Sequence, residues 1–194
     1  MQFPIDITLK LGGWRARLRL SDSAGETLGF ARLPKGKDGR WALFADESES
    51  REIYIVRWEH GLSHWFEDPQ GRKLGSFGVM PGEEGKVVSV AGVPSFRFVD
   101  ETPGLDSLDK WIPNLPLLNG ITGALVKPRM RAVRTDGGAG VARIIKTRLM
   151  VDVRYTLVAF GRIDGREMEC LILGAVLQCL QDHLFSFDEW MWRA

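Results

Sequence analysis

The segment from Cys170 to Leu180, CLILGAVLQCL, constrains the fold more than any other part of the chain. Ten of its eleven residues are apolar or glycine, so a helix built from them has no polar face to present to water. Asp164 is suited to be its N-cap, and Glu167 follows at the spacing of a capping box. A membrane-spanning helix needs roughly 17 to 25 apolar residues, and this run ends at the polar residues Gln181, Asp182 and His183. We therefore predict a helix that is surrounded by the rest of the protein.

Composition places the chain among globular proteins and excludes a strong overall electric field. The 194 residues are 44% hydrophobic and 26% charged, with a net charge of +1, so attraction to phosphate or lipid requires a local patch. Cys170 and Cys179 are nine positions apart, about half a turn out of phase on the predicted helix, and read as small apolar core residues rather than a disulfide. The first residues lack the pattern of a secretory signal. We expect a cytoplasmic protein, either free or peripheral to a membrane, with no transmembrane segment.

Most of the preceding chain has the pattern of short antiparallel strands. Leu18 and Leu20 alternate with Arg17 and Arg19, the period of a strand with one dry and one wet face. Because every connection is short, we expect hairpins and meanders rather than βαβ units. The predicted strands include 14–20, 27–33, 53–58, 63–67, 74–79, 129–134, 141–147 and 153–160.

Two of the predicted hairpin turns share one motif. The segments 22–29 and 68–75 both read D-x-x-G-x-x-L-G, 46 residues apart. Aspartate can accept hydrogen bonds from the backbone two residues on, and glycine supplies the positive φ that closes the turn. Two copies with the Leu-Gly in register favour a duplicated hairpin unit, although such turns also recur in unrelated β proteins.

Two segments depart from the strand pattern. Residues 101–128 contain helically spaced apolar residues interrupted by prolines and glycines, and we read them as an inserted loop that forms either a lid or a plug. Residues 184–194 form an aromatic tail that is expected to pack on the barrel or on a second subunit. We predict one domain over residues 1–194.

The order of these elements resembles a known superfamily. The segments that carry the resemblance are 18–25, 65–75 and 141–146, which leads through 155–157 into the apolar helix. They resemble the tubby-like C-terminal domain, shared by tubby proteins, phospholipid scramblases and LURP-one-related proteins. The resemblance implies a mainly β fold, a closed antiparallel barrel of about twelve strands around a C-terminal hydrophobic helix. It also implies lipid-related roles, phosphoinositide binding or lipid movement, but a calcium site like that of a scramblase is not recognisable here.

The clearest chemical feature is a basic segment of 22 residues that contains one acid, Asp136. Lys127, Arg129 and Arg131 alternate with other residues and should project from one face of a strand, and the next strand could extend the patch. Such a patch would bind phosphate or anionic head groups. The alternative is a solvated barrel exterior whose charge is balanced by Asp46, Glu47, Glu49 or Glu52. The predicted anion or lipid site is Lys127, Arg129, Arg131, Arg134, Arg143, Lys146 and Arg148.

No pattern in the chain points to a catalytic residue, a cofactor or a metal. His60 and His64 flank a probable turn at Gly61, which would place them on different strands, and His183 fits the polar end of the helix. The glycines of 136–140 lack the ending of a phosphate loop and precede a strand. Nucleic acid is disfavoured by the near-neutral charge.

We therefore expect a non-enzymatic binding or scaffold module whose partner is an anionic phospholipid head group or a protein. Two alternatives remain at this stage, a scramblase-like lipid protein and an enzyme with a site at the barrel mouth near residues 111–123. The oligomeric state is left open.

Overall fold

The protein is described by a computed structural model that covers residues 2–10, 17–32, 39–59, 63–82, 85–102, 129–148 and 152–183. Within these ranges the chain forms twelve strands and one helix, α3, which runs from Gly165 to His183. The strands are β1 Ile5–Lys10, β2 Arg17–Ser21, β3 Thr27–Arg32, β4 Arg40–Phe44, β5 Glu52–Glu59, β6 Ser63–Glu67, β7 Lys73–Val79, β8 Lys86–Val90, β9 Val93–Asp100, β10 Arg129–Arg134, β11 Gly140–Arg148 and β12 Asp152–Ala159.

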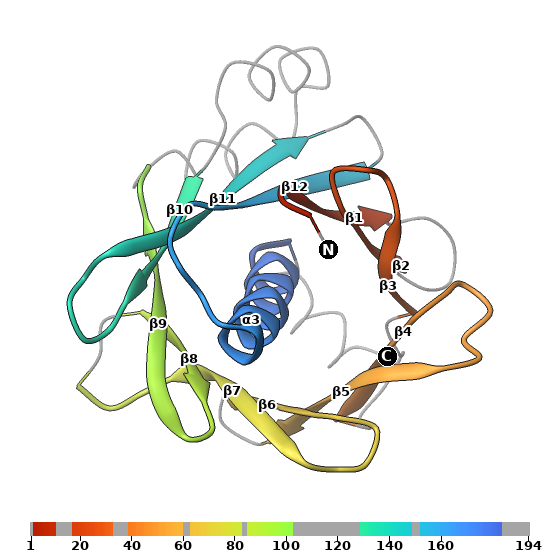
Figure 1. Cartoon of the computed structure of the whole chain (residues 1–194), viewed down its shortest axis with the longest axis horizontal. Helices are drawn as coiled ribbons and strands as arrows, with labels where there is room; N and C mark the ends of the chain where they lie inside the picture. The colour runs from red at the N-terminus through yellow and green to blue at the C-terminus, as the bar shows by residue number, and fades with distance from the viewer. Residues whose placement is uncertain are drawn as a thin grey trace.

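The twelve strands form a closed antiparallel barrel. Each strand pairs with its neighbours in the sequence, and β1 pairs with β12 to close the ring, with Ile7 opposite Tyr155. Figure 1 looks into the ring and shows α3 inside it. Closure gives every strand two partners, so the meander leaves no exposed edge. The predicted fold class, a closed barrel of about twelve strands around a C-terminal helix, is confirmed.

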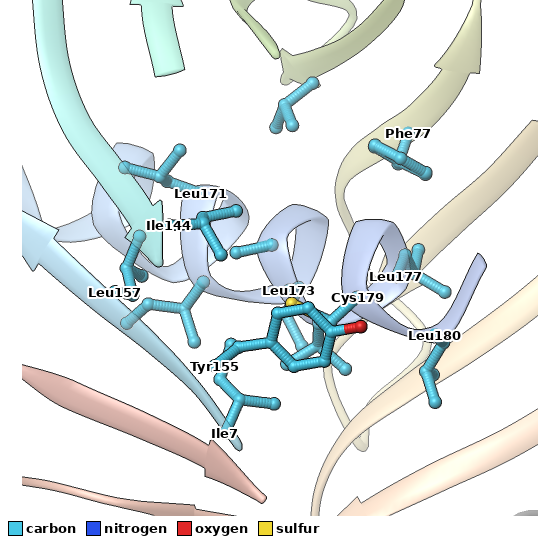
Figure 2. Close-up of a cluster of buried hydrophobic side chains, with 14 of the residues drawn as sticks. Ile7, Phe77, Ile144, Tyr155, Leu157, Leu171, Leu173, Leu177, Cys179 and Leu180 are labelled. Atoms are coloured by element: carbon cyan, nitrogen blue, oxygen red, sulfur yellow. The ribbon is translucent and has the colours of Figure 1, made fainter. Parts of the chain in front are cut away.

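Alternation along the strands builds the core. Ile5, Ile7 and Leu9 of β1 are buried, whereas the residues between them are partly or fully exposed. The inward side chains of the strands meet a helix that is buried at every position from Cys170 to Leu180. Figure 2 shows Tyr155 and Leu157 on one side of the helix and Phe77 on another. The apolar segment is therefore enclosed by the apolar side chains of the strands, as its sequence predicted.

The start of α3 is fixed by the predicted cap. The carboxylate of Asp164 accepts a hydrogen bond from the Glu167 N–H at 2.7 Å, and the Asp164 carbonyl accepts from the Met168 N–H at 2.9 Å. Ile163 and Met168 pack against the core beside this turn. The capping box is only half used, because the Glu167 side chain turns to Arg134 instead.

The two D-x-x-G turns have matching geometry. In each, the aspartate carbonyl accepts from the glycine N–H at 2.9 Å, and one carboxylate oxygen accepts two further backbone N–H bonds of 2.9 to 3.1 Å. Gly25 and Gly71 have φ angles of 82° and 80°, the left-handed region that glycine adopts without strain. Both hairpins carry a bulge beside the turn, where Leu28 and Leu74 are the extra residues on the strand that follows it. The turn chemistry predicted from the motif is confirmed at both sites.

The strand ends lie close to the predicted ones. The strand predicted at 63–67 agrees with β6 and that at 129–134 with β10, and most of the others differ by one residue at one or both ends. Residues 14–16, the inserted segment 103–128 and the tail 184–194 lie outside the described residues. Within the described ranges, no helix combines the length and the apolar character needed to cross a bilayer.

Candidate anion-binding surface

Several of the predicted basic residues lie on two adjacent strands, β10 and β11. In the pairing of β10 with β11, Arg131 lies directly opposite Arg143, and Arg129 lies opposite Ile145. Met130 pairs with the buried Ile144 on the core side. Because neighbouring residues of a strand point to opposite faces, the three arginines share the outer face of the barrel. We call Arg129, Arg131 and Arg143 the outer arginine cluster.

One carboxylate joins two members of this cluster. Glu101, which follows β9, lies 2.6 Å from the Arg131 guanidinium through Oε1 and 2.6 Å from Arg143 Nε through Oε2. Arg143 also donates from a terminal nitrogen to Glu101 Oε1 at 3.0 Å. The hydrogen bond from Arg143 lowers the pKa of Glu101, and the same bond raises the pKa of Arg143. Glu101 is therefore a fixed anion at neutral pH.

Charge is nevertheless in excess at this cluster. Among the described residues, Arg131 and Arg143 share one carboxylate and Arg129 adds a third positive charge. The side chains of Arg131 and Arg143 remain 45% and 35% exposed, while Glu101 is only 16% exposed. Guanidinium carries five N–H donors in a planar fork, so one carboxylate does not use the donors of two arginines. Donors thus remain for a second oxyanion on the outer face.

Lys146 does not extend this cluster. Lys146 pairs with Tyr155 and follows the inward positions Ala142 and Ile144 along β11. Its Nζ lies 6.0 Å from the centre of the Tyr155 ring, which is buried inside the barrel. Arg148 is the last residue of β11, and its side chain lies outside what the structure describes. Lys127 lies outside the described residues.

Arg134 has a structural partner at the helix. Its guanidinium donates two hydrogen bonds to the Glu167 carboxylate, at 3.0 and 2.8 Å, and a third to the Arg162 carbonyl at 3.1 Å. It also lies 5.4 Å from the ring centre of Phe96. The bond to Glu167 raises the pKa of Arg134. Arg134 therefore holds the first turn of α3 against β10. This structural contact differs from the anion-binding role that the sequence analysis predicted for it.

Three of the four acids considered as balancing charges have other partners. Glu49 pairs with Arg32 at 2.8 Å, and Glu52 pairs with Arg40 at 3.0 Å. Asp46 accepts hydrogen bonds from Ser48 and Ser50 in its own turn. The balancing acid at β10 and β11 is instead Glu101. Sequence reasoning missed it because segment 103–128 separates it from Arg129 in the chain, and only the pairing of β9 with β10 brings them together.

The histidine and cysteine side chains show no catalytic arrangement among the described residues. His64 lies beside Phe77, with ring centres 6.3 Å apart, and burial together with the charge of Lys86 lowers its pKa to about 4. Burial raises the pKa of Cys170 to about 12, which keeps the thiol protonated at neutral pH. Within the same residues no three His, Cys, Asp or Glu side chains are placed to hold a metal ion. His60 and the proposed enzyme site near 111–123 lie outside these ranges.

Comparison with known proteins identifies a fold and no activity. No family model and no curated protein matches the chain. The X-ray structure of a protein from Arabidopsis thaliana aligns with it at a TM-score of 0.51 and 12% sequence identity, over 91% of this chain and 91% of that chain. Similarity at this identity shows the fold alone. The chain therefore shares its overall architecture with a plant protein of known structure.

Proposed function

We propose that the protein is a non-enzymatic binding module of the tubby-like superfamily that holds anionic phospholipid head groups on the outer face of β10 and β11. The observation that carries the proposal is the outer arginine cluster, in which Arg131 and Arg143 share one carboxylate and Arg129 lies on the same face. Arginine recognises phosphate through parallel N–H bonds, so the exposed donors match the chemistry of a phosphorylated head group.

The expected affinity is modest. A basic residue near an anionic membrane contributes about 1 kcal/mol, and Glu101 offsets part of the charge of the cluster. Binding should therefore be reversible, depend on the phosphate content of the membrane and weaken as the salt concentration rises. These features describe a peripheral protein that samples a membrane surface.

The test is flotation with phosphatidylcholine vesicles that do or do not contain phosphatidylinositol bisphosphate. The variant Arg129→Glu with Arg131→Glu should lose most of the phosphoinositide-dependent flotation of the unchanged protein. The matched control is Arg40→Glu with Arg57→Glu, which makes the same change in charge on the outer face of β4 and β5. Thermal unfolding of both variants verifies that each remains folded.

Two results would remove the proposal. The first is flotation of the β10 variant that equals flotation of the unchanged protein. The second is an equal loss in the β10 variant and in the control, because that pattern would reflect net charge rather than a site.

A further inference from the structure

Closure of the barrel assembles a second group of basic residues that are far apart in the sequence. In the pairing of β1 with β2, Lys10 lies opposite Arg17, and Thr8 lies opposite Arg19. In the pairing of β1 with β12, Thr8 also lies opposite Arg154. We call Lys10, Arg17, Arg19 and Arg154 the second basic cluster.

All four side chains lie on the outer face and are exposed. Arg17 and Arg19 alternate with Leu18 and Leu20, which are buried in the core, and Lys10 follows the buried Leu9. Two acidic positions accompany them. Asp6 lies 3.9 Å from Arg154, a long ion pair, and the backbone register puts Asp152 opposite Lys10. Within the described part of the chain, the cluster therefore brings four basic residues together with two acidic positions.

The outer face of β4 to β6 differs in its balance of charge. There Arg40 pairs with Glu52 at 3.0 Å and Arg57 pairs with Glu67 at 2.7 Å, one cation to one anion. An evenly paired exterior is the ordinary solvated surface of a barrel. Among the described residues of these faces, basic side chains outnumber the acids on β10 to β12, β1 and β2, but not on β4 to β6.

The two clusters face different directions. Three strand steps separate the pair β10 and β11 from the pair β1 and β2, and each step around a twelve-stranded barrel turns the surface by about 30°. The clusters are also offset along the strands, because Arg143 lies opposite Val158 and Lys10 lies opposite Asp152. Three steps therefore turn the outward direction by roughly 90° between the two clusters.

We propose that the protein bridges two anionic membrane surfaces, one held by the outer arginine cluster and the other by the second basic cluster. The inference rests on the proposed function for the first cluster and extends the same head-group chemistry to the second. One flat membrane that contacts the first cluster cannot contact a cluster turned away by such an angle. The second cluster then stays open to another membrane, and many weak contacts between two vesicles add up through avidity.

The experiment measures vesicle clustering alongside vesicle binding. Phosphatidylcholine vesicles containing phosphatidylinositol bisphosphate are mixed with the full chain, and their apparent diameter is followed by dynamic light scattering while flotation records binding. The unchanged protein should raise the diameter several-fold. A large excess of protein should reverse the rise, because every vesicle is then coated and none offers a bare surface.

Single-cluster variants separate bridging from binding. Arg17→Glu with Arg19→Glu removes the second cluster, and Arg129→Glu with Arg131→Glu removes the first. The variant of the second cluster should keep most of the flotation, and the variant of the first should keep only the smaller part that the second cluster supports. Both should lose the clustering. Arg40→Glu with Arg57→Glu, on the evenly paired face, should keep both. Thermal unfolding and size measurement of all variants verify folding and the state of association in solution.

The outcomes are distinct. Flotation of the unchanged protein without clustering would overturn the bridging inference and leave the proposed function standing. Clustering that persists in either single-cluster variant would also overturn it, because a self-associated protein with one binding face would behave in that way. Absence of flotation in the unchanged protein would overturn both proposals together.

Discussion

Gly174 of α3 lies so close to Val88 of β8 that a Cβ atom added to the glycine would come within 3.0 Å of Val88 Cγ2. The same side of the helix meets β7, where a Cβ on Gly75 would lie 2.9 Å from Cys170 Sγ. These contacts explain why α3 packs most closely on β7 and β8. A helix inside a barrel needs small residues where its backbone approaches the wall, and glycine gives the closest approach.

Replacing this glycine tests the close approach. Alanine is normally favoured over glycine inside a helix by about 1 kcal/mol, so Gly174→Ala would stabilise an unconstrained helix. We expect the opposite, a loss of about 1 to 3 kcal/mol in the free energy of unfolding, because the methyl group overpacks the contact with Val88. Urea denaturation measures the loss. The double variant with Val88→Ala should show positive coupling, since removing the valine methyl groups makes room, and additive losses would contradict the contact.

Arg134 should contribute to stability far more than a comparable arginine on the exterior. Arg134→Lys removes a bidentate pair with Glu167 at partly buried side chains, which are 28% and 19% exposed, and should cost about 1 to 2 kcal/mol. The matched control is Arg40→Lys, because Arg40 makes two 3.0 Å contacts with Glu52 at a more exposed site and should cost no more than about 0.5 kcal/mol. Equal losses in chemical denaturation would remove the proposed clamp on α3.

Much of the fold was readable from the chain because local chemistry fixed it. The run from Cys170 to Leu180 could only be buried, and the aspartate and glycine of each repeated motif closed a tight turn. The alternation of faces in β11 could also have been used to divide the basic segment. Arg143 and Lys146 are three residues apart, so their side chains point to opposite faces of the strand. Counting charges along the chain therefore overstated the size of one patch.

Other features depend on contacts that no local pattern specifies. The pairing of Ile7 with Tyr155 closes the barrel across almost the whole chain, and it alone places Arg154 beside the outer residues of β1. Glu101 meets Arg143 for the same kind of reason, through strands separated by a long segment. Register between distant strands is set by the whole core, so the site could be assembled only after the barrel was known.

Removing the shared carboxylate should strengthen binding at the outer arginine cluster. Glu101→Gln frees donors on Arg131 and Arg143 and adds one net positive charge at the surface. At about 1 kcal/mol per charge, flotation affinity for phosphoinositide vesicles should rise roughly fivefold, with a steeper salt dependence. Glu47→Gln is the control, because it makes the same charge change at an exposed residue after β4. An equal gain in both variants would show that net charge, not the cluster, governs binding.

Acid should destabilise the protein through His64, which is held neutral against the barrel interior by burial and by the nearby charge of Lys86. The pKa of His64 is about 4 in the folded protein and 6.5 when the side chain is free in water, so the unfolded chain binds the proton first as the pH falls. Stability linked to this residue is therefore complete above pH 6.5 and decreases as the pH falls toward about 4, by at most about 3 kcal/mol. Denaturation midpoints across this window measure the decrease. Because carboxylates titrate there too, the decisive comparison is His64→Gln, which should show a shallower dependence on pH, and parallel curves for the two proteins would contradict the assignment.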